Sequence, residues 1–206
     1  MLQRFIAKQL ANPSGWFGRF VTAKWLEDNN VLMNQMTLDT LAIEENTQVL
    51  EIGFGSGHLL SLLLAKKCSV TGIELSSEML KLATKRFKSK LNVGQCALQL
   101  GDIQALPFSA QQFDAVCSVN TLYFWSDPDK ALQECHRVLR AQGKLVLTFD
   151  AKSSLAAWSG SKYGFRLYEC DEVEALLSRN GFANITWQAA TNPASGLFYV
   201  VSATAL

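Results

Sequence analysis

Three glycines at alternate positions, Gly53, Gly55 and Gly57, follow a short run of strand-forming residues at 48–52. A leucine-rich stretch at 59–64 comes next, so the pattern indicates a strand, a tight turn and a helix, the first half of a βαβ unit. Glycines at such a turn permit positive φ angles and let a ligand approach the bare backbone. The start of the helix offers free N–H groups and a positive dipole end. The pattern therefore predicts a small-molecule site at the carboxyl end of this strand.

Acidic residues end or follow two further predicted strands. Glu74 ends a strand predicted at 69–74, and Asp102 follows one predicted at 96–100. A carboxylate at the position of Glu74 can accept hydrogen bonds from both hydroxyl groups of a ribose. The structural alternatives are a surface glutamate next to a helix cap at Ser76 and an aspartate that only shapes a turn.

The spacing of the loop separates two kinds of nucleotide site. In a dinucleotide fingerprint, G-x-G-x-x-G, the third glycine would stand at the position of His58. Here the spacing is G-x-G-x-G, and Glu51 stands two positions before Gly53. With Glu74 and Asp102, this arrangement resembles the first motifs of the class I S-adenosylmethionine-dependent methyltransferases. The segments Leu106-Pro107-Phe108 and 113–116 resemble later motifs of that family.

The resemblance covers roughly residues 47–206 and implies the role of each matching residue. Glu74 would bind the ribose, and Asp102 would accept a hydrogen bond from the adenine amino group. Leu75 and Ile103 follow these acids and could sandwich the adenine ring. Glu51 would either orient the ammonium group of the cofactor or satisfy N–H groups of the loop. We therefore expect the residues that bind S-adenosyl-L-methionine, and its product S-adenosyl-L-homocysteine, to be Glu51, Gly53, Phe54, Gly55, Gly57, Glu74, Leu75, Asp102, Ile103 and Asn120.

The methyl acceptor is expected near the loop at 120–125, because ligands of open α/β sheets lie outside the carboxyl ends of the strands. Tyr123 is the first candidate for a catalytic residue, through its ring or its hydroxyl group, and packing is the alternative. His58 is a second candidate, although it could simply begin a helix. Asp150, at the end of a predicted strand, could also face the acceptor, as could Tyr163 and Tyr168.

The expected reaction is transfer of a methyl group to a small-molecule acceptor, and the chain resembles the branch of quinone-biosynthesis and phospholipid N-methylating enzymes. A lipid or quinone-like acceptor is therefore compatible with it. An NAD-dependent oxidoreductase is an alternative that the glycine spacing opposes. A non-catalytic protein that uses the same fold to bind a cofactor or a partner is another.

Composition bounds the remaining properties. The 206 residues suit one domain, and the formal net charge of +1 gives no electrostatic basis for binding nucleic acid. Five scattered cysteines suggest reduced thiols and a cytoplasmic location, and two histidines show no metal-ligand spacing. We expect no metal site and no membrane-spanning segment, although peripheral contact with lipid is compatible with the sequence. Arg4, Lys8 and Gln9 interrupt any signal-peptide pattern.

Strands and helices alternate after residue 47, which predicts a doubly wound, mostly parallel sheet with helices on both faces. Further strands are expected at 113–119, 144–149, 185–189 and 198–202, and helices at 76–90, from 128 to before Gly143, and at 171–180. Two final strands without an intervening helix make the last one antiparallel, and the resemblance implies seven strands in all.

Residues 1–46 form a predicted helical extension in front of the core at 47–206. Apolar side chains recur there at helical spacing, namely Trp16, Phe17, Phe20, Val21 and Trp25. These could pack on the core, cover the ligand as a lid, or face a lipid surface. We expect residues 1–30 to gate the site.

Overall fold

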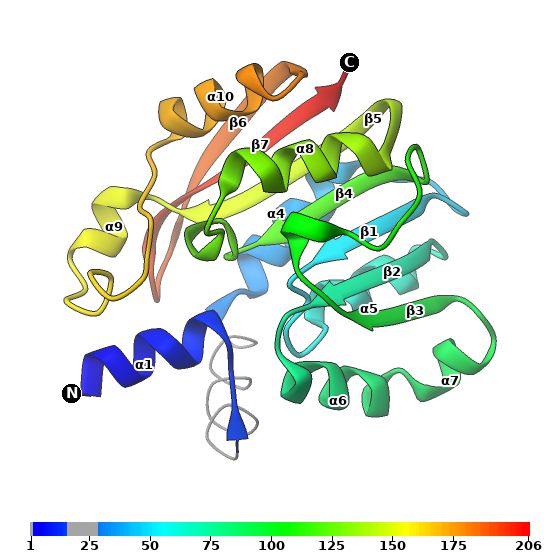
Figure 1. The fold of residues 1–206 in the computed structure, drawn as a ribbon, viewed down its shortest axis with the longest axis horizontal. Helices are drawn as coiled ribbons and strands as arrows, with labels where there is room; N and C mark the ends of the chain where they lie inside the picture. The colour runs from blue at the N-terminus through cyan, green and yellow to red at the C-terminus, as the bar shows by residue number, and fades with distance from the viewer. Residues whose placement is uncertain (1, 16–28) are drawn as a thin grey trace.

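A seven-stranded sheet in the order β3-β2-β1-β4-β5-β7-β6 forms the centre of the computed structural model, which describes residues 2–15 and 29–206 (Figure 1). Neighbouring strands are parallel from β3 to β5, whereas β7 is antiparallel to β5 and β6. This arrangement confirms the predicted fold class and the reversed last strand. The strands are β1 (Gln48–Ile52), β2 (Ser69–Glu74), β3 (Cys96–Leu100), β4 (Phe113–Val119), β5 (Leu139–Asp150), β6 (Phe182–Asn192) and β7 (Gly196–Ala205).

Successive residues of the central strands face two separate apolar clusters. Leu50 and Val116 belong to the cluster under α8 (Pro128–Val138) and α10 (Cys170–Arg179). Val49 and Cys117 belong to the cluster under α4 (Val31–Leu41) and α5 (His58–Ala65). Figure 1 shows α8 and α10 on the near side of the sheet. Because side chains alternate between the faces of a strand, a sheet covered on both sides needs nearly continuous apolar strands.

Two helix starts that the sequence predicts are present. The hydroxyl oxygen of Ser76 accepts a hydrogen bond from the Met79 N–H at 3.2 Å, and the Asp127 carboxylate accepts one from the Lys130 N–H at 3.1 Å. The helix expected at 76–90 is divided into α6 (Ser77–Arg86) and α7 (Lys88–Asn92). The residue between them, Phe87, is buried in the core.

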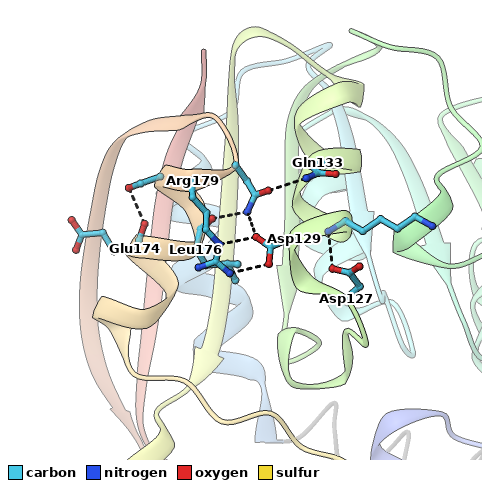
Figure 2. A network of polar contacts seen from close by, with 9 residues as sticks. Asp127, Asp129, Gln133, Glu174, Leu176 and Arg179 are labelled. Atoms are coloured by element: carbon cyan, nitrogen blue, oxygen red, sulfur yellow. Dashed lines mark hydrogen bonds and ion pairs between the residues drawn. The ribbon is translucent and has the colours of Figure 1, made fainter.

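An ion pair on α8 and α10 joins the two helices on the near face (Figure 2). The Asp129 carboxylate accepts hydrogen bonds from Arg179 at 2.7 and 2.9 Å and from the Asn180 amide at 2.7 Å. The hydrogen bonds from Arg179, and to a smaller extent the one from Asn180, lower the pKa of Asp129 to about 2. The contact is solvent-exposed, so it contributes little to stability.

Strand boundaries differ from the expected ones in the second half of the sheet. β5 begins at Leu139 instead of Lys144, because Leu139 pairs with Phe113 ahead of a bulge in the register. The last two strands are longer than expected, since their hairpin pairing continues to Asn192 and Gly196. A short helix, α9 (Lys152–Ala156), follows β5 directly.

The N-terminal helix α1 (Leu2–Ala11) lies outside the two helical layers (Figure 1). The aromatic series from Trp16 to Trp25 lies outside the described residues. Across 2–15 and 29–206, each helix is too short or too polar to cross a bilayer.

Candidate cofactor and acceptor site

A cavity of about 280 Å³ lies at the carboxyl ends of β1, β2, β3 and β4. Its wall contains nine of the ten expected cofactor residues, namely Glu51, Gly53, Phe54, Gly55, Glu74, Leu75, Asp102, Ile103 and Asn120. Gly57 is not part of that wall, because a side chain there would point at the ring of Phe87, 2.4 Å away. The tertiary structure thus brings the predicted residues together, while their individual roles stay predictions.

The first two glycines of the loop have different surroundings. Gly53 has a φ of +70°, and a Cβ there would lie 2.4 Å from Cγ2 of Thr121, so a larger residue would meet both strain and a clash. Gly55 has a φ of +54°, and apart from its two chain neighbours no atom of the described residues lies within 4 Å of where its Cβ would be. Its backbone therefore presents an open surface to a ligand.

Glu74 connects the end of β2 to the glycine loop. Its buried carboxylate accepts hydrogen bonds from the N–H groups of Gly55 and Ser76, each at 2.9 Å. Burial raises the pKa of Glu74, while these N–H groups act in the opposite direction. Each carboxylate oxygen keeps lone pairs for further hydrogen bonds, so the expected ribose contacts remain available.

Glu51 is the least satisfied carboxylate in the cavity wall. Its side chain is 4% exposed, and its Oε2 atom has no hydrogen-bond partner among the described residues. Burial, and then the nearby Glu74 carboxylate, raise the pKa of Glu51 well above its ordinary value. A buried carboxylate oxygen without a partner fits a cationic group of a bound ligand.

Asp102 and Ile103, after β3, line the cavity together with Leu75, which follows β2. The Asp102 carboxylate accepts a hydrogen bond from the Gln104 N–H at 2.9 Å, which begins the short helix η2 (Ile103–Ala105). Ile103 is buried, whereas Leu75 is 53% exposed. Both line the cavity, as a pair of residues that encloses an aromatic ring would.

The charges of the wall favour S-adenosylmethionine over a dinucleotide. Glu51, Glu74 and Asp102 contribute carboxylates, and the part of the wall that the structure describes contains no lysine or arginine. S-adenosylmethionine carries a sulfonium and an ammonium group, whereas a dinucleotide carries a pyrophosphate that three carboxylates would repel. The residues present therefore fit this cofactor.

Replacement of Glu51 by glutamine should stabilise the ligand-free protein and weaken cofactor binding. Because the pKa of Glu51 is raised above 4.5, the folded state binds more protons than the unfolded state just above that pH. The free energy of unfolding therefore falls as pH rises through this window, and Glu51→Gln removes the loss. We expect the free energy of unfolding at pH 8 to rise by an amount on the order of 1–2 kcal/mol. The melting temperature should rise by about 2–4 °C for each kcal/mol.

Calorimetric unfolding at pH 5 and pH 8, with and without S-adenosylmethionine, checks this prediction. Glu45→Gln is the matched control, since the Glu45 side chain is 61% exposed and paired with Lys67. Cofactor affinity of Glu51→Gln equal to that of the wild type would show that Glu51 only serves the loop.

A second, larger cavity of about 680 Å³ adjoins the first. Leu10, Asn30, Asn120 and Phe124 line both cavities, so the two share a wall. Most of the remaining wall of the second cavity is apolar or aromatic, with Ile6, Tyr123, Leu155, Ala157, Trp158, Phe165 and Ala194. We call it the acceptor cavity.

Tyr123 lines the acceptor cavity and contacts Asn120, which lies in the wall shared by the two cavities. Its hydroxyl group donates a hydrogen bond to Oδ1 of Asn120 at 2.6 Å and accepts one from the backbone N–H of Asp150. Burial, and then the Asp150 carboxylate, raise the pKa of Tyr123 well above its ordinary value. The phenol therefore keeps its proton at neutral pH, and it can position Asn120 but is a poor general base.

Asn120, the first residue after β4, has a left-handed backbone with a φ of +56°. Its amide nitrogen donates to Oδ1 of Asn30 at 3.0 Å, at the start of α4. The side chain thus connects β4, α4 and Tyr123 at the boundary of the two cavities. Asparagine tolerates this backbone better than most residues do, and such strain is concentrated at functional sites.

His58 lies on the cofactor side of this boundary. Its Nδ1 atom is 3.2 Å from Nδ2 of Asn34, and both residues line the first cavity. His58 is not among the described lining residues of the acceptor cavity. Its catalytic role stays a prediction, with access to the cofactor rather than to the acceptor.

Several lining residues carry no sequence signal. Asn30 and Asn34 line the cofactor cavity but belong to no motif. Asp150 lines the acceptor cavity, as its place at a strand end suggests, whereas Tyr163 and Tyr168 line neither cavity in the described part of the chain. Proximity of α4 to the loop could not be read from local patterns.

Residues 50–147 match the family model described as "Methyltransferase domain". The chain is 35% identical over 130 residues to the Bacillus subtilis (strain 168) protein named "Uncharacterized methyltransferase YdaC", covering 62% of this chain and 70% of that protein. It is 33% identical over 130 residues to the demethylmenaquinone methyltransferase of Thermotoga maritima, covering 62% of this chain and 54% of that protein.

A solved structure of Haemonchus contortus phosphoethanolamine N-methyltransferase 2 in complex with S-adenosyl-L-methionine has a similar fold. The TM-score is 0.77 at 18% identity, with 91% of this chain and 56% of that chain covered. The chain thus spans little more than half the length of that enzyme and of the Thermotoga relative. These likenesses give no support to the oxidoreductase alternative. Together with the carboxylate-lined cavity, they show that the chain belongs to the class I S-adenosylmethionine-dependent methyltransferases.

Proposed function

We propose that this protein transfers a methyl group from S-adenosylmethionine to a small acceptor with a largely apolar body, bound in the acceptor cavity. The observation that carries the proposal is the shared wall of the two cavities, with Asn120 in it. A cavity of about 680 Å³ has the size of a typical site for a small molecule. A quinone-like or lipid-like body fits its apolar part, in line with the names of the relatives.

The described residues would act mainly by positioning. S-adenosylmethionine supplies an electrophilic methyl group when bound. Glu51, Glu74 and Asp102 would hold the cofactor, while Asn120 and Tyr123 define the boundary across which acceptor and methyl group meet. Rate enhancement would then come from alignment of the acceptor and from exclusion of water.

Two measurements test the proposal. Calorimetry should show binding of S-adenosylmethionine, and S-adenosylmethionine with a radiolabelled methyl group should label a component of a small-molecule acceptor pool. Cofactor binding without transfer to any pool would favour the non-catalytic alternative. Cytoplasmic location is part of the proposal and is supported by the five cysteines, which are all buried and unpaired in the structure.

The N-terminal segment is proposed to cover both cavities. Leu10 lines both of them, Ala11 and Pro13 line the cofactor cavity, and the carbonyl oxygen of Pro13 accepts a hydrogen bond from the Ser76 hydroxyl group beside Glu74. Binding of the cofactor should therefore slow amide hydrogen exchange in α1. Helix α10, whose residues line neither cavity, is the internal control. Equal exchange in α1 with and without cofactor would show that the segment is only scaffold.

A further inference from the structure

Asp150 is a buried carboxylate in the wall of the acceptor cavity, whose other described lining residues are uncharged. It ends β5, and its side chain is 6% exposed. Its Oδ1 atom accepts a hydrogen bond from the Ser195 hydroxyl group at 2.5 Å, and no hydrogen bond to Oδ2 comes from the described residues. Among the described residues that line the acceptor cavity, Asp150 is the only one with a carboxylate, and none has a basic side chain. A buried carboxylate in such surroundings favours a ligand that brings a positive charge or an N–H group.

Aromatic rings form the adjoining wall. Phe165 stacks on Tyr123 with ring centroids 5.6 Å apart, and it makes edge-to-face contacts with Phe124 and Trp158, with centroids 4.7 and 5.5 Å apart. All four residues line the acceptor cavity. Ring faces attract ammonium groups, and they also pack against an apolar body. The described wall contains no lysine, arginine or histidine, so it offers no counter-charge to a carboxylate or phosphate.

Asp150 also lies close to the cofactor boundary. Its backbone N–H donates to the Tyr123 hydroxyl group, which in turn donates to Asn120 in the shared wall. A nitrogen held by Asp150 would therefore lie at the end of the cavity nearest the cofactor, with its body extending toward Phe165 and Trp158.

We propose that the acceptor is an organic amine with an apolar body, and that Asp150 binds its nitrogen and removes its proton. This inference rests on the proposed function and narrows the acceptor class. The ammonium form transfers one proton to the Asp150 carboxylate. The freed lone pair of the nitrogen forms the new N–C bond, and the C–S bond breaks with its electron pair left on sulfur. The methylated ammonium product leaves, and Asp150 returns its proton to solvent.

Three probes with one body and different head groups test this inference. They are 2-phenylethylamine, 2-phenylethanol and 3-phenylpropionate, titrated by NMR into protein saturated with S-adenosylhomocysteine. The amine should bind at least about tenfold more tightly than the other two. It should also be the probe that accepts a tritiated methyl group from S-adenosylmethionine.

Asp150→Asn keeps the shape of the side chain and the oxygen that accepts from Ser195. It should abolish the preference for the amine and lower methyl transfer to it by about 10²-fold or more, with S-adenosylhomocysteine affinity unchanged. Asp39→Asn is the matched control, because Asp39 is exposed on α4. Phe165→Leu keeps an apolar side chain and should weaken binding of the amine more than that of the alcohol.

The outcomes separate this inference from the proposed function. An amine that binds Asp150→Asn as tightly as the wild type overturns the inference, and so does a wild-type preference for the alcohol or the carboxylate. If no probe binds while S-adenosylhomocysteine does, the assignment of an arylalkyl amine site is also wrong. Failure of the wild type to bind the cofactor would instead contradict the proposed function itself.

Discussion

Tyr123→Phe is expected to lower turnover of a verified acceptor by about 10²-fold, because a small displacement at a reacting centre costs this much. The substitution keeps the ring, which stacks on Phe165, and removes the hydroxyl group that joins Asn120 to Asp150. Oδ1 of Asn120 and the backbone N–H of Asp150 would both lose a partner. The residues at the boundary of the two cavities should therefore shift while the apolar packing persists.

Kinetics of purified variants distinguish this positioning role from acid–base chemistry. Burial and the Asp150 carboxylate hold the pKa of Tyr123 high, so its hydroxyl group does not ionise in the working range. We expect the pH profile of the remaining activity of Tyr123→Phe to keep the shape of the wild-type profile. Tyr123→Ala should lose turnover as well and keep nearly the same cofactor affinity. Tyr163→Phe, at an exposed position that lines neither cavity in the described chain, is the control.

Two results would change the interpretation of Tyr123. If Tyr123→Ala turns over the acceptor at the wild-type rate, the residue only packs. If Tyr123→Phe is fully active and Tyr123→Ala is not, the ring alone matters, as a surface for the acceptor or for the transferred methyl group.

Glu74→Ala is expected to weaken S-adenosylmethionine binding by roughly 1.5–3 kcal/mol. The carboxylate would lose charge-assisted hydrogen bonds to the ribose, and the N–H groups of Gly55 and Ser76 would lose their acceptor. The loop would therefore lose support even without ligand. Isothermal titration calorimetry on the folded variant measures the effect.

Glu74→Gln separates the two contributions, because the amide keeps one acceptor oxygen for the loop and removes the charge. We expect its affinity to lie between those of the wild type and Glu74→Ala. Glu45→Ala, on an exposed surface, should bind the cofactor normally. An unchanged dissociation constant for Glu74→Ala would rule out the ribose assignment.

The cofactor half of the site could be predicted from sequence because its determinants are local. Gly53 and Gly55 lie in one turn, and Glu74 and Asp102 end or follow neighbouring parallel strands, whose carboxyl ends meet at one edge of the sheet. The fold class follows from the same alternation of strands and helices. The ends of β5, β6 and β7 could not be predicted as well, because pairing with a partner strand decides how far each continues.

The acceptor half depends on contacts between distant segments. Asp150 and Ser195 are 45 residues apart in sequence, and Asn30 and Asn120 are 90 apart, so no local pattern indicates either hydrogen bond. Tyr123 illustrates the difference. Its place after β4 predicted that it would lie near the acceptor, but only the tertiary structure showed that Asn120 and Asp150 already occupy its hydroxyl group. The sequence alone determined which cofactor the site takes, because the residues of the motif lie in one turn and at the ends of two strands. Tertiary structure decided the shape and charge of the acceptor cavity, since its described lining comes from segments far apart in sequence, at 6–10, 29–30, 120–124, 150–165 and 194–195.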